Sequence, residues 1–350
     1  MLTDAAVSII FIDCFDRTGK GPVICDGDSG NICRRRIIGY MKKDNKLFSR
    51  SKSKEARMFY LFISPWLIGF LIFTLVPMVT SAVLSFMNWD YISSPQFIGF
   101  QNYVKLFHDK LFYKSLKVTA IYSIFAVPLQ LVAAFFLAML LNAKIKGMSV
   151  FRTIFYLPSL VSGAAAAVLW LWMFNPEFGV INTILGYFGI KGPGWVFDKH
   201  WALPALIIMS LWGVGGSMLI YLTGLQGIPT ELYEAAEIDG ATARVKLFRI
   251  TIPMMTPVIF YNLIMGIIGS FQSFTQSYVM TNGGPQYSTY FYVYYLYENA
   301  FRNFNIGYAS AQAWILFFII LILTALIFRS SAGWVYYESE MKKVKKKGGK

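Results

Sequence analysis

The sequence predicts an all-α integral membrane protein with six transmembrane helices. Three observations predict this fold: the composition, the lengths of the apolar runs and the distribution of basic residues. Of 350 residues, 56% are hydrophobic and only 14% are charged, whereas soluble domains carry about 25% charged residues. This composition argues against a soluble enzyme. The formal net charge of +14 does not indicate a nucleic-acid-binding protein, because the basic residues flank apolar runs instead of gathering on one solvated face.

Six stretches are long enough to span a membrane, since about 20 apolar residues in a helix cross roughly 30 Å of hydrocarbon. None of them contains Asp, Glu, Lys or Arg. In chain order the predicted spans are Met58–Asn88, Val118–Ala143, Thr153–Pro176, Trp201–Thr230, the first half of Ile250–Tyr297, and Asn303–Phe328. Prolines inside them, such as Pro128 and Pro158, predict kinks that neighbouring helices tolerate.

The basic residues predict the orientation of these spans, because Lys and Arg are retained on the cytoplasmic side. If both termini are cytoplasmic, the four cytoplasmic segments after residue 40 carry 20 Lys and Arg. The three opposite loops carry 7. This asymmetry predicts that both termini are cytoplasmic and that the number of spans is even.

The two ends of the chain differ from the apolar domain between them. Residues 1–40 form an atypical extension that contains all three cysteines and has no sustained helical period. We expect translation to begin at Met41, whose basic continuation over 41–57 is typical of a cytoplasmic lead into a first span. The predicted six-helix domain covers 58–329. The basic tail 330–350 is expected to be attracted to anionic membrane lipid.

The three outer loops are Trp89–Leu116, Glu177–His200 and Asn282–Tyr308, and they are longer than simple turns. The third contains a tyrosine-rich run, Tyr287–Tyr297. Two interpretations of this run stay open: it docks an external partner, or it anchors a helix at the membrane interface. The cysteine spacing contains no CxxC unit, so no metal site is expected.

One cytoplasmic connection, Gly227–Thr256, is long enough to form structure of its own. Thr230 is expected to cap a first short helix, and Asp239-Gly240 to turn the chain. Thr242 is expected to cap a second helix. An amphipathic hairpin of this size is marginal in water, so it could simply lie on the bilayer surface.

The same connection carries a motif. The order Glu234-Ala235-Ala236, then Gly240, then after nine residues Ile250, followed by Ile252-Pro253, resembles the EAA loop of binding-protein-dependent ABC importer permeases. In that resemblance the loop covers 228–256. The similarity extends from Met58 to about Lys343 and is greatest to the carbohydrate-importer branch, typified by the larger permease of the maltose system. Further matches are Phe97–Tyr103, Phe151–Thr153, Leu157-Pro158 and Asn282–Pro285.

The resemblance implies a multi-pass subunit of a bacterial plasma membrane that imports a sugar or oligosaccharide. It implies a second permease subunit, two ATP-binding subunits and an extracellular solute-binding protein as partners. No GxxxxGK[ST] motif occurs in the chain, so we expect no enzymatic activity and no cofactor, with ATP bound by the partner subunits. Gly240→Asp is expected to abolish uptake and ATPase association without preventing membrane insertion. The implied ATPase-coupling residues are Tyr233, Glu234, Ala235, Ala236, Asp239, Gly240, Arg244 and Pro253.

Substrate-path candidates lie in the fourth and fifth predicted spans. They combine amide or hydroxyl groups with aromatic rings, which suit hydroxyl-rich neutral solutes; they are Trp212, Gly213, Gln272, Ser273, Gln276 and Tyr278. The polar members could equally bond across helices as structural contacts. An alternative function, an ion-coupled secondary transporter of a neutral polar solute, usually needs an ionisable group within a span, and these spans contain no carboxylate.

Overall fold

The computed structural model describes residues 57–143, 145–331 and 333–336, and most of these residues are helical. The predictions for the extension 1–40, for nearly all of the basic lead 41–57 and for most of the tail 330–350 lie outside the described residues. The chain divides into two compact units, Met1–Met78 and Val79–Lys350. The described part of the first unit is apolar helix, and the helix Arg57–Leu84 runs on into the second unit.

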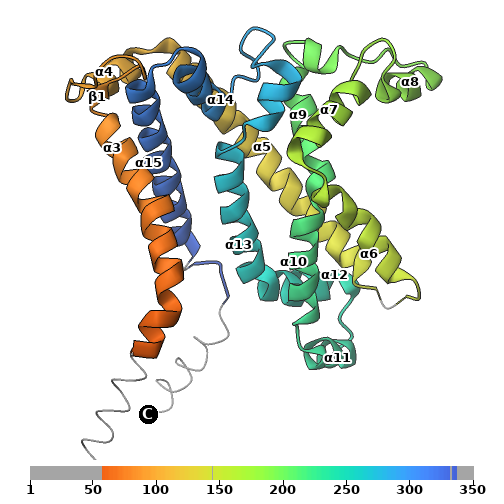
Figure 1. Cartoon of the computed structure of the whole chain (residues 1–350). Helices are drawn as coiled ribbons and strands as arrows, with labels where there is room; N and C mark the ends of the chain where they lie inside the picture. The colour runs from red at the N-terminus through yellow and green to blue at the C-terminus, as the bar shows by residue number, and fades with distance from the viewer. Residues whose placement is uncertain (1–56, 144, 332, 337–350) are drawn as a thin grey trace, which may run out of the picture. The chain divides into compact units, whose positions relative to one another are not determined.

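Most elements belong to the second unit (Figure 1). The helix Arg57–Leu84 includes a π-helical turn, η1 (Leu71–Leu75), and α3 (Val76–Leu84). The elements that follow are β1 (Met87–Asn88), β2 (Gln96–Phe97), α4 (Gln101–His108), α5 (Lys110–Leu141), α6 (Met148–Tyr156), η2 (Leu157–Leu160), α7 (Gly163–Met173), α8 (Val180–Tyr187), η3 (Trp195–Phe197), α9 (Ala202–Ser210), η4 (Leu211–Gly213), α10 (Gly215–Gln226), α11 (Thr230–Ile238), α12 (Ala243–Lys246), η5 (Leu247–Thr251), α13 (Ile252–Phe271), η6 (Ser277–Thr281), α14 (Tyr292–Tyr297), η7 (Glu298–Arg302) and α15 (Ile306–Ser331). Strands β1 and β2 form a small antiparallel pair in which Met87 faces Phe97.

Candidate membrane spans number between four and six among the described residues. Four are continuous helices that are long and apolar enough: Arg57–Leu84, Lys110–Leu141, Ala243–Phe271 and Ile306–Ser331. Two further candidates are bent pairs, each counting as one span if its halves cross together; they are Met148–Leu160 with Gly163–Met173 and Ala202–Gly213 with Gly215–Gln226. The prediction of a helical membrane protein is confirmed.

The predicted third span, Thr153–Pro176, is not a kinked helix but a broken one, because its halves meet at 98°. Pro158 lies in the 3-10 turn η2 and has no N–H to continue a helix. Ser162 then takes an extended conformation and its hydroxyl accepts from the Ala165 N–H at 3.3 Å, so it caps a new helix. The prediction of a kink at Pro158 therefore underestimates the bend.

The core lies where α5, α10 and α13 pack side by side (Figure 1). At one end of these helices a buried cluster includes Ala134 and Ala138 of α5, Met218 of α10 and Met255 of α13. The small alanines let the neighbouring helix approach closely. A larger buried cluster at the other end includes Phe112, Tyr122 and three tyrosines of α14, Tyr292, Tyr294 and Tyr295.

Candidate functional site

A cavity of about 440 Å³ opens between the central helices. Its walls come from α5, the break between α6 and α7, the break between α9 and α10, α13 and the segment after α13. The lining residues include two aromatic rings, Tyr122 and Trp212, and three amides, Gln130, Asn262 and Gln276. Its size falls within the range of about 300–1,000 Å³ that small-molecule sites occupy.

Both breaks in the bent helices border this cavity. Pro158, Ser159 and Gly163 lie at the first break and line the cavity, as do Trp212 and Gly213 at the second. Irregular backbone at membrane depth is tolerated where it lines a cavity, because polar groups there are not exposed to lipid. Both helices are therefore interrupted where their backbone borders the cavity instead of lipid.

At the second break, α10 packs closely against α6 next to the cavity. A Cβ atom placed on Gly215 would lie 2.4 Å from the backbone oxygen of Phe155. Only glycine allows α10 to approach α6 so closely.

The cavity wall is polar but uncharged among the residues that the structure describes. Gln130 is half-buried and its side chain makes no hydrogen bond to another described residue. In contrast, Gln276 accepts a hydrogen bond from Ser273 at 2.7 Å, and the Asn262 amide donates to the Val258 carbonyl at 2.9 Å. Gln130 thus has the amide with the greatest free capacity to bond a solute.

The structure brings together four of the six predicted substrate-path residues. Trp212, Gly213, Ser273 and Gln276 line the cavity. Gln272 does not line the cavity, because it is exposed just beyond the end of α13.

Tyr278 also lies outside the cavity wall. Its ring packs against Phe274 at 5.1 Å and Tyr297 at 5.2 Å, measured between ring centroids. The predicted polar stripe bonds along its own segment, from Ser273 to Gln276, instead of across helices.

Sequence reasoning missed Gln130 and Asn262. Both are amide residues inside otherwise apolar spans, which is a usable signal. Hydropathy alone does not tell which side of a helix faces a cavity, so their role needed the structure.

At the other end of the core, α11 follows α10, and the chain turns at Asp239-Gly240 into α12 and η5 (Figure 1). We call this segment, residues 230–251, the elbow. Helix α11 ends in a Schellman motif: the Ala241 N–H donates to the Ala236 carbonyl at 2.8 Å, and the Gly240 N–H donates to the Glu237 carbonyl at 3.0 Å. Gly240 has φ +73°, a left-handed conformation that other residues adopt at a cost. The predicted turn at Asp239-Gly240 is confirmed.

Three side-chain interactions hold the elbow together. The Tyr233 and Thr251 hydroxyls lie 2.9 Å apart, and Lys246 bonds Glu237 at 2.7 Å. Thr242 caps α12 by accepting from the Val245 N–H at 3.4 Å, as predicted. The hydrogen bond from Lys246, together with its positive charge, lowers the pKa of the Glu237 carboxyl.

The predicted cap at Thr230 is wrong, because α11 begins at Thr230 itself and no side chain caps it. Pro229 occupies the cap position, and its side chain has no oxygen that could accept a hydrogen bond from the first turn.

The predicted coupling residues divide between two sides of the elbow. Tyr233 packs on the core and Ala236 is half-buried. Glu234, Ala235, Asp239, Gly240 and Arg244 are exposed, and Pro253 is half-buried at the start of α13.

Two further apolar residues of α11 are exposed, Leu232 at 42% and Ile238 at 88%. Ile238 was not singled out from the sequence, although its immediate neighbours Glu237 and Asp239 are both acidic.

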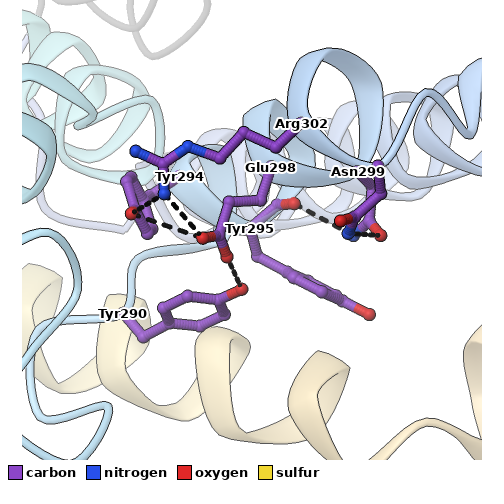
Figure 2. A network of polar contacts seen from close by, with 7 residues as sticks. Tyr290, Tyr294, Tyr295, Glu298, Asn299 and Arg302 are labelled. Carbon is purple, nitrogen blue, oxygen red and sulfur yellow. Dashed lines mark hydrogen bonds and ion pairs between the residues drawn. The ribbon is translucent and has the colours of Figure 1, made fainter.

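The opposite end of the core holds a network of tyrosines (Figure 2). The Glu298 carboxylate accepts from the Tyr290 hydroxyl, from Tyr294 at 3.4 Å and from Arg302 at 3.0 Å. Burial, followed by the charge and hydrogen bond of Glu298, raises the pKa of Tyr290 above its ordinary value.

The sequence left two interpretations of the run Tyr287–Tyr297, docking of an external partner or anchoring at the membrane interface, and neither fits the middle of the run. Tyr292, Tyr294 and Tyr295 of α14 are buried, so they neither dock a partner nor anchor at an interface. Tyr292 bonds the backbone carbonyl of Gln312 at 2.9 Å, which ties α14 to α15.

Asp109 joins this network to α5. Its carboxylate accepts from the Tyr295 hydroxyl, from the Tyr308 hydroxyl at 2.8 Å and from the Leu111 N–H at 2.8 Å, which caps α5. Burial alone would raise the pKa of Asp109, but the hydrogen bonds from both tyrosines outweigh it and the pKa lies below its ordinary value.

Comparison with known proteins gives concordant matches. The family described as "Binding-protein-dependent transport system inner membrane component" matches residues 121–336. A probable ABC transporter permease protein of Bacillus subtilis, YesP, is 43% identical over 297 residues, which cover 83% of this chain and 96% of the relative. The probable starch degradation products transport system permease protein AmyD of Thermoanaerobacterium thermosulfurigenes is 31% identical, with 82% and 96% covered.

The fold is also similar to that of a solved structure. A chain from a bacterial alginate ABC transporter, solved in complex with alginate pentasaccharide-bound periplasmic protein, has a TM-score of 0.70 at 24% identity. The match covers 79% of this chain and 95% of that chain.

Proposed function

This chain belongs to the family of inner-membrane components of binding-protein-dependent transport systems, and from that premise we propose that its cavity conducts a sugar or oligosaccharide. It is a permease subunit of an ABC importer. The observation that carries the proposed substrate class is the cavity wall, in which amides, hydroxyls and two aromatic rings combine without a charged side chain among the described residues. Such groups bond hydroxyls and stack on the apolar faces of sugar rings.

The relatives support this substrate class. AmyD is named for the transport of starch degradation products. The structure with the similar fold comes from an alginate importer. An ion-coupled secondary transporter, the alternative that the sequence left open, does not fit membership of this family.

We further propose that each bent pair crosses the membrane once, which gives six spans with both termini cytoplasmic. In this arrangement α11 lies on the cytoplasmic side and the tyrosine network on the outer side. The cell membrane of a bacterium is the proposed location.

The proposed partners are a second permease subunit, two ATP-binding subunits and an extracellular solute-binding protein. The chain itself is proposed to be non-catalytic and to need no cofactor. We propose that the exposed face of α11 that carries Glu234 and Ile238 docks on an ATP-binding subunit. The bonds from Tyr233 to Thr251 and from Lys246 to Glu237 would carry ATPase movement into α13.

The test compares two variants, one that replaces an amide in the cavity wall and one that replaces a matched amide outside the cavity. Gln130→Leu removes an amide from the cavity wall, while Gln272→Leu makes the same chemical change at an exposed position. Losing one hydrogen bond of about 1–1.5 kcal/mol to a transported sugar should lower uptake by roughly 5- to 10-fold. Uptake is measured in vesicles that contain the complete transporter and its loaded solute-binding protein.

Assembly is checked in the same preparations by the ATPase activity that the loaded binding protein stimulates. We expect Gln130→Leu to retain this stimulation while uptake falls, and Gln272→Leu to retain both. Unchanged uptake by Gln130→Leu, or equal losses in both variants, would remove the cavity from the transport path.

A further inference from the structure

Helix α5 has one buried side and one exposed side along its whole length. Near its start the buried side includes Phe112, Ser115 and Thr119. The exposed side carries large apolar residues at helical spacing: Ile124 is 65% exposed, Phe125 60%, Val132 67% and Phe136 54%. A row of exposed apolar side chains on a membrane-spanning helix is the surface that contacts lipid chains.

Three lysines extend this exposed row to the beginning of the helix. Lys110, Lys114 and Lys117 are separated by four and three residues, which places them on one face. Counting on at the same spacing leads to Ile121, Ile124 and Phe125, so the lysines and the apolar row share that face.

These lysines are not paired with a carboxylate in the described part of the chain. The neighbouring Asp109 carboxylate bonds Tyr295, Tyr308 and the Leu111 N–H and none of the three lysines. The three ammonium groups therefore keep their donors for an external anion.

The length of α5 indicates where these charges lie relative to the hydrocarbon layer of the membrane. Its 32 residues extend about 48 Å, whereas the hydrocarbon layer is about 30 Å thick. The continuous uncharged part begins at Val118, so Lys117 and Lys114 lie within about 6 Å of the apolar boundary along the helix. Lysines at that level extend their charged ends among lipid headgroups while their methylene stems remain on the apolar surface.

We propose that Lys114 and Lys117, together with Lys110, bind the headgroup phosphate of an anionic phospholipid whose acyl chains lie along Ile124 and Phe125. The site is at the end of α5 remote from α11. A lipid fits better than an acidic protein, because the charged row continues without interruption into the apolar row and one molecule with a charged head and apolar tails satisfies both. The site does not depend on which solute the transporter carries.

The test compares two double variants with the same charge change. Lys114→Gln with Lys117→Gln removes two charges from the proposed site. Lys191→Gln with Lys199→Gln removes two from the connection between α7 and α9, where neither residue belongs to a membrane-spanning helix. Each complete transporter is purified from membranes that contain phosphatidylglycerol and phosphatidylcholine, and retained lipids are counted by native mass spectrometry.

With about a five-fold loss of affinity for each lysine removed, the α5 double variant should retain phosphatidylglycerol about 10- to 30-fold more weakly than the unmodified complex. The control pair should retain it normally, and Lys114→Arg with Lys117→Arg should restore retention because the charges return. Soluble glycerol phosphate, which lacks acyl chains, should not displace the lipid.

Three results would overturn the proposal. They are normal phosphatidylglycerol retention by the α5 double variant, an equal loss in the control pair, and displacement by glycerol phosphate, which would indicate a simple anion site. Sugar uptake is measured separately, so a failure of the lipid site leaves the proposed transport function unaffected and the converse also holds.

Discussion

Gly240 offers the most direct test of how the elbow is built. Its φ of +73° closes the Schellman motif at the end of α11, and no atom lies within 4 Å of where a Cβ would be. A substitution there therefore meets no steric obstacle and changes only the backbone preference. Alanine in this left-handed conformation costs about 1–2 kcal/mol, which is roughly a 5- to 30-fold shift against the closed turn.

A series of substitutions separates backbone conformation from charge. Gly240→Ala should weaken association with the ATP-binding subunit by up to that factor. Gly240→Asn should weaken it less, because asparagine tolerates the left-handed conformation. Gly240→Asp also tolerates it, but adds a negative charge beside Asp239 at a helix C-terminus, where the helix dipole disfavours anions. Asp should therefore be worse than Asn.

The assay measures how much ATP-binding subunit co-purifies with the permease, together with solute uptake. Gly216→Ala is the matched control, because Gly216 lies in α10, has no positive φ and has no atom near its would-be Cβ. The reasoning is refuted if Gly240→Ala associates as well as the unmodified chain, or if the alanine, asparagine and control variants are all affected equally.

Three further predictions concern packing, pH and the elbow. Gly215→Ala should destabilise the purified complex by about 1–3 kcal/mol through a clash with the Phe155 backbone, seen as a lower unfolding temperature than that of Gly216→Ala. Burial, together with the hydrogen bond to Asp109, raises the pKa of Tyr295 to about 12 in the folded protein. A tyrosine in the unfolded chain has a pKa of about 10, so as the pH rises the unfolded chain loses this proton before the folded protein does. The contribution of the Tyr295 hydroxyl to the free energy of unfolding is therefore complete below about pH 10 and is lost towards about pH 12. The unfolding temperature of Tyr295→Phe should lack this part of the decrease at alkaline pH. Tyr233→Phe removes a hydroxyl bond of about 1 kcal/mol within the elbow, and the solute carried for each ATP hydrolysed should fall while assembly, measured by co-purification, stays normal.

The four continuous apolar helices and the turn at Gly240 were predictable from the sequence because each depends on a local property. Long uncharged apolar runs have few alternatives to membrane helices. The turn at Gly240 is similarly local, since a Schellman motif needs only a few backbone groups.

The cavity was only partly predictable, since it depends on which helix sides meet. Ser273 and Gln276 were identified because they lie in one visible polar stripe. Gln272 belongs to the same stripe, but the chain after α13 leaves it exposed. Gln130 is a single amide in an apolar run, and its orientation follows only from the packing of α5.

The size of the bend at Val161-Ser162 was not predictable, because a nearby proline such as Pro158 accompanies a slight kink or a sharp corner depending on its neighbours. The burial of Tyr292 was not predictable either. Its hydroxyl finds a partner twenty residues ahead in the chain, at the Gln312 carbonyl.

The two broken helices have a mechanical consequence. When a straight helix tilts as a rigid body, both of its ends move. In a helix that is broken halfway along, one half can tilt while the other half stays in place. Because the breaks after Leu160 and Gly213 both border the cavity, the half of each bent helix on one side of the cavity can move without carrying the other half with it.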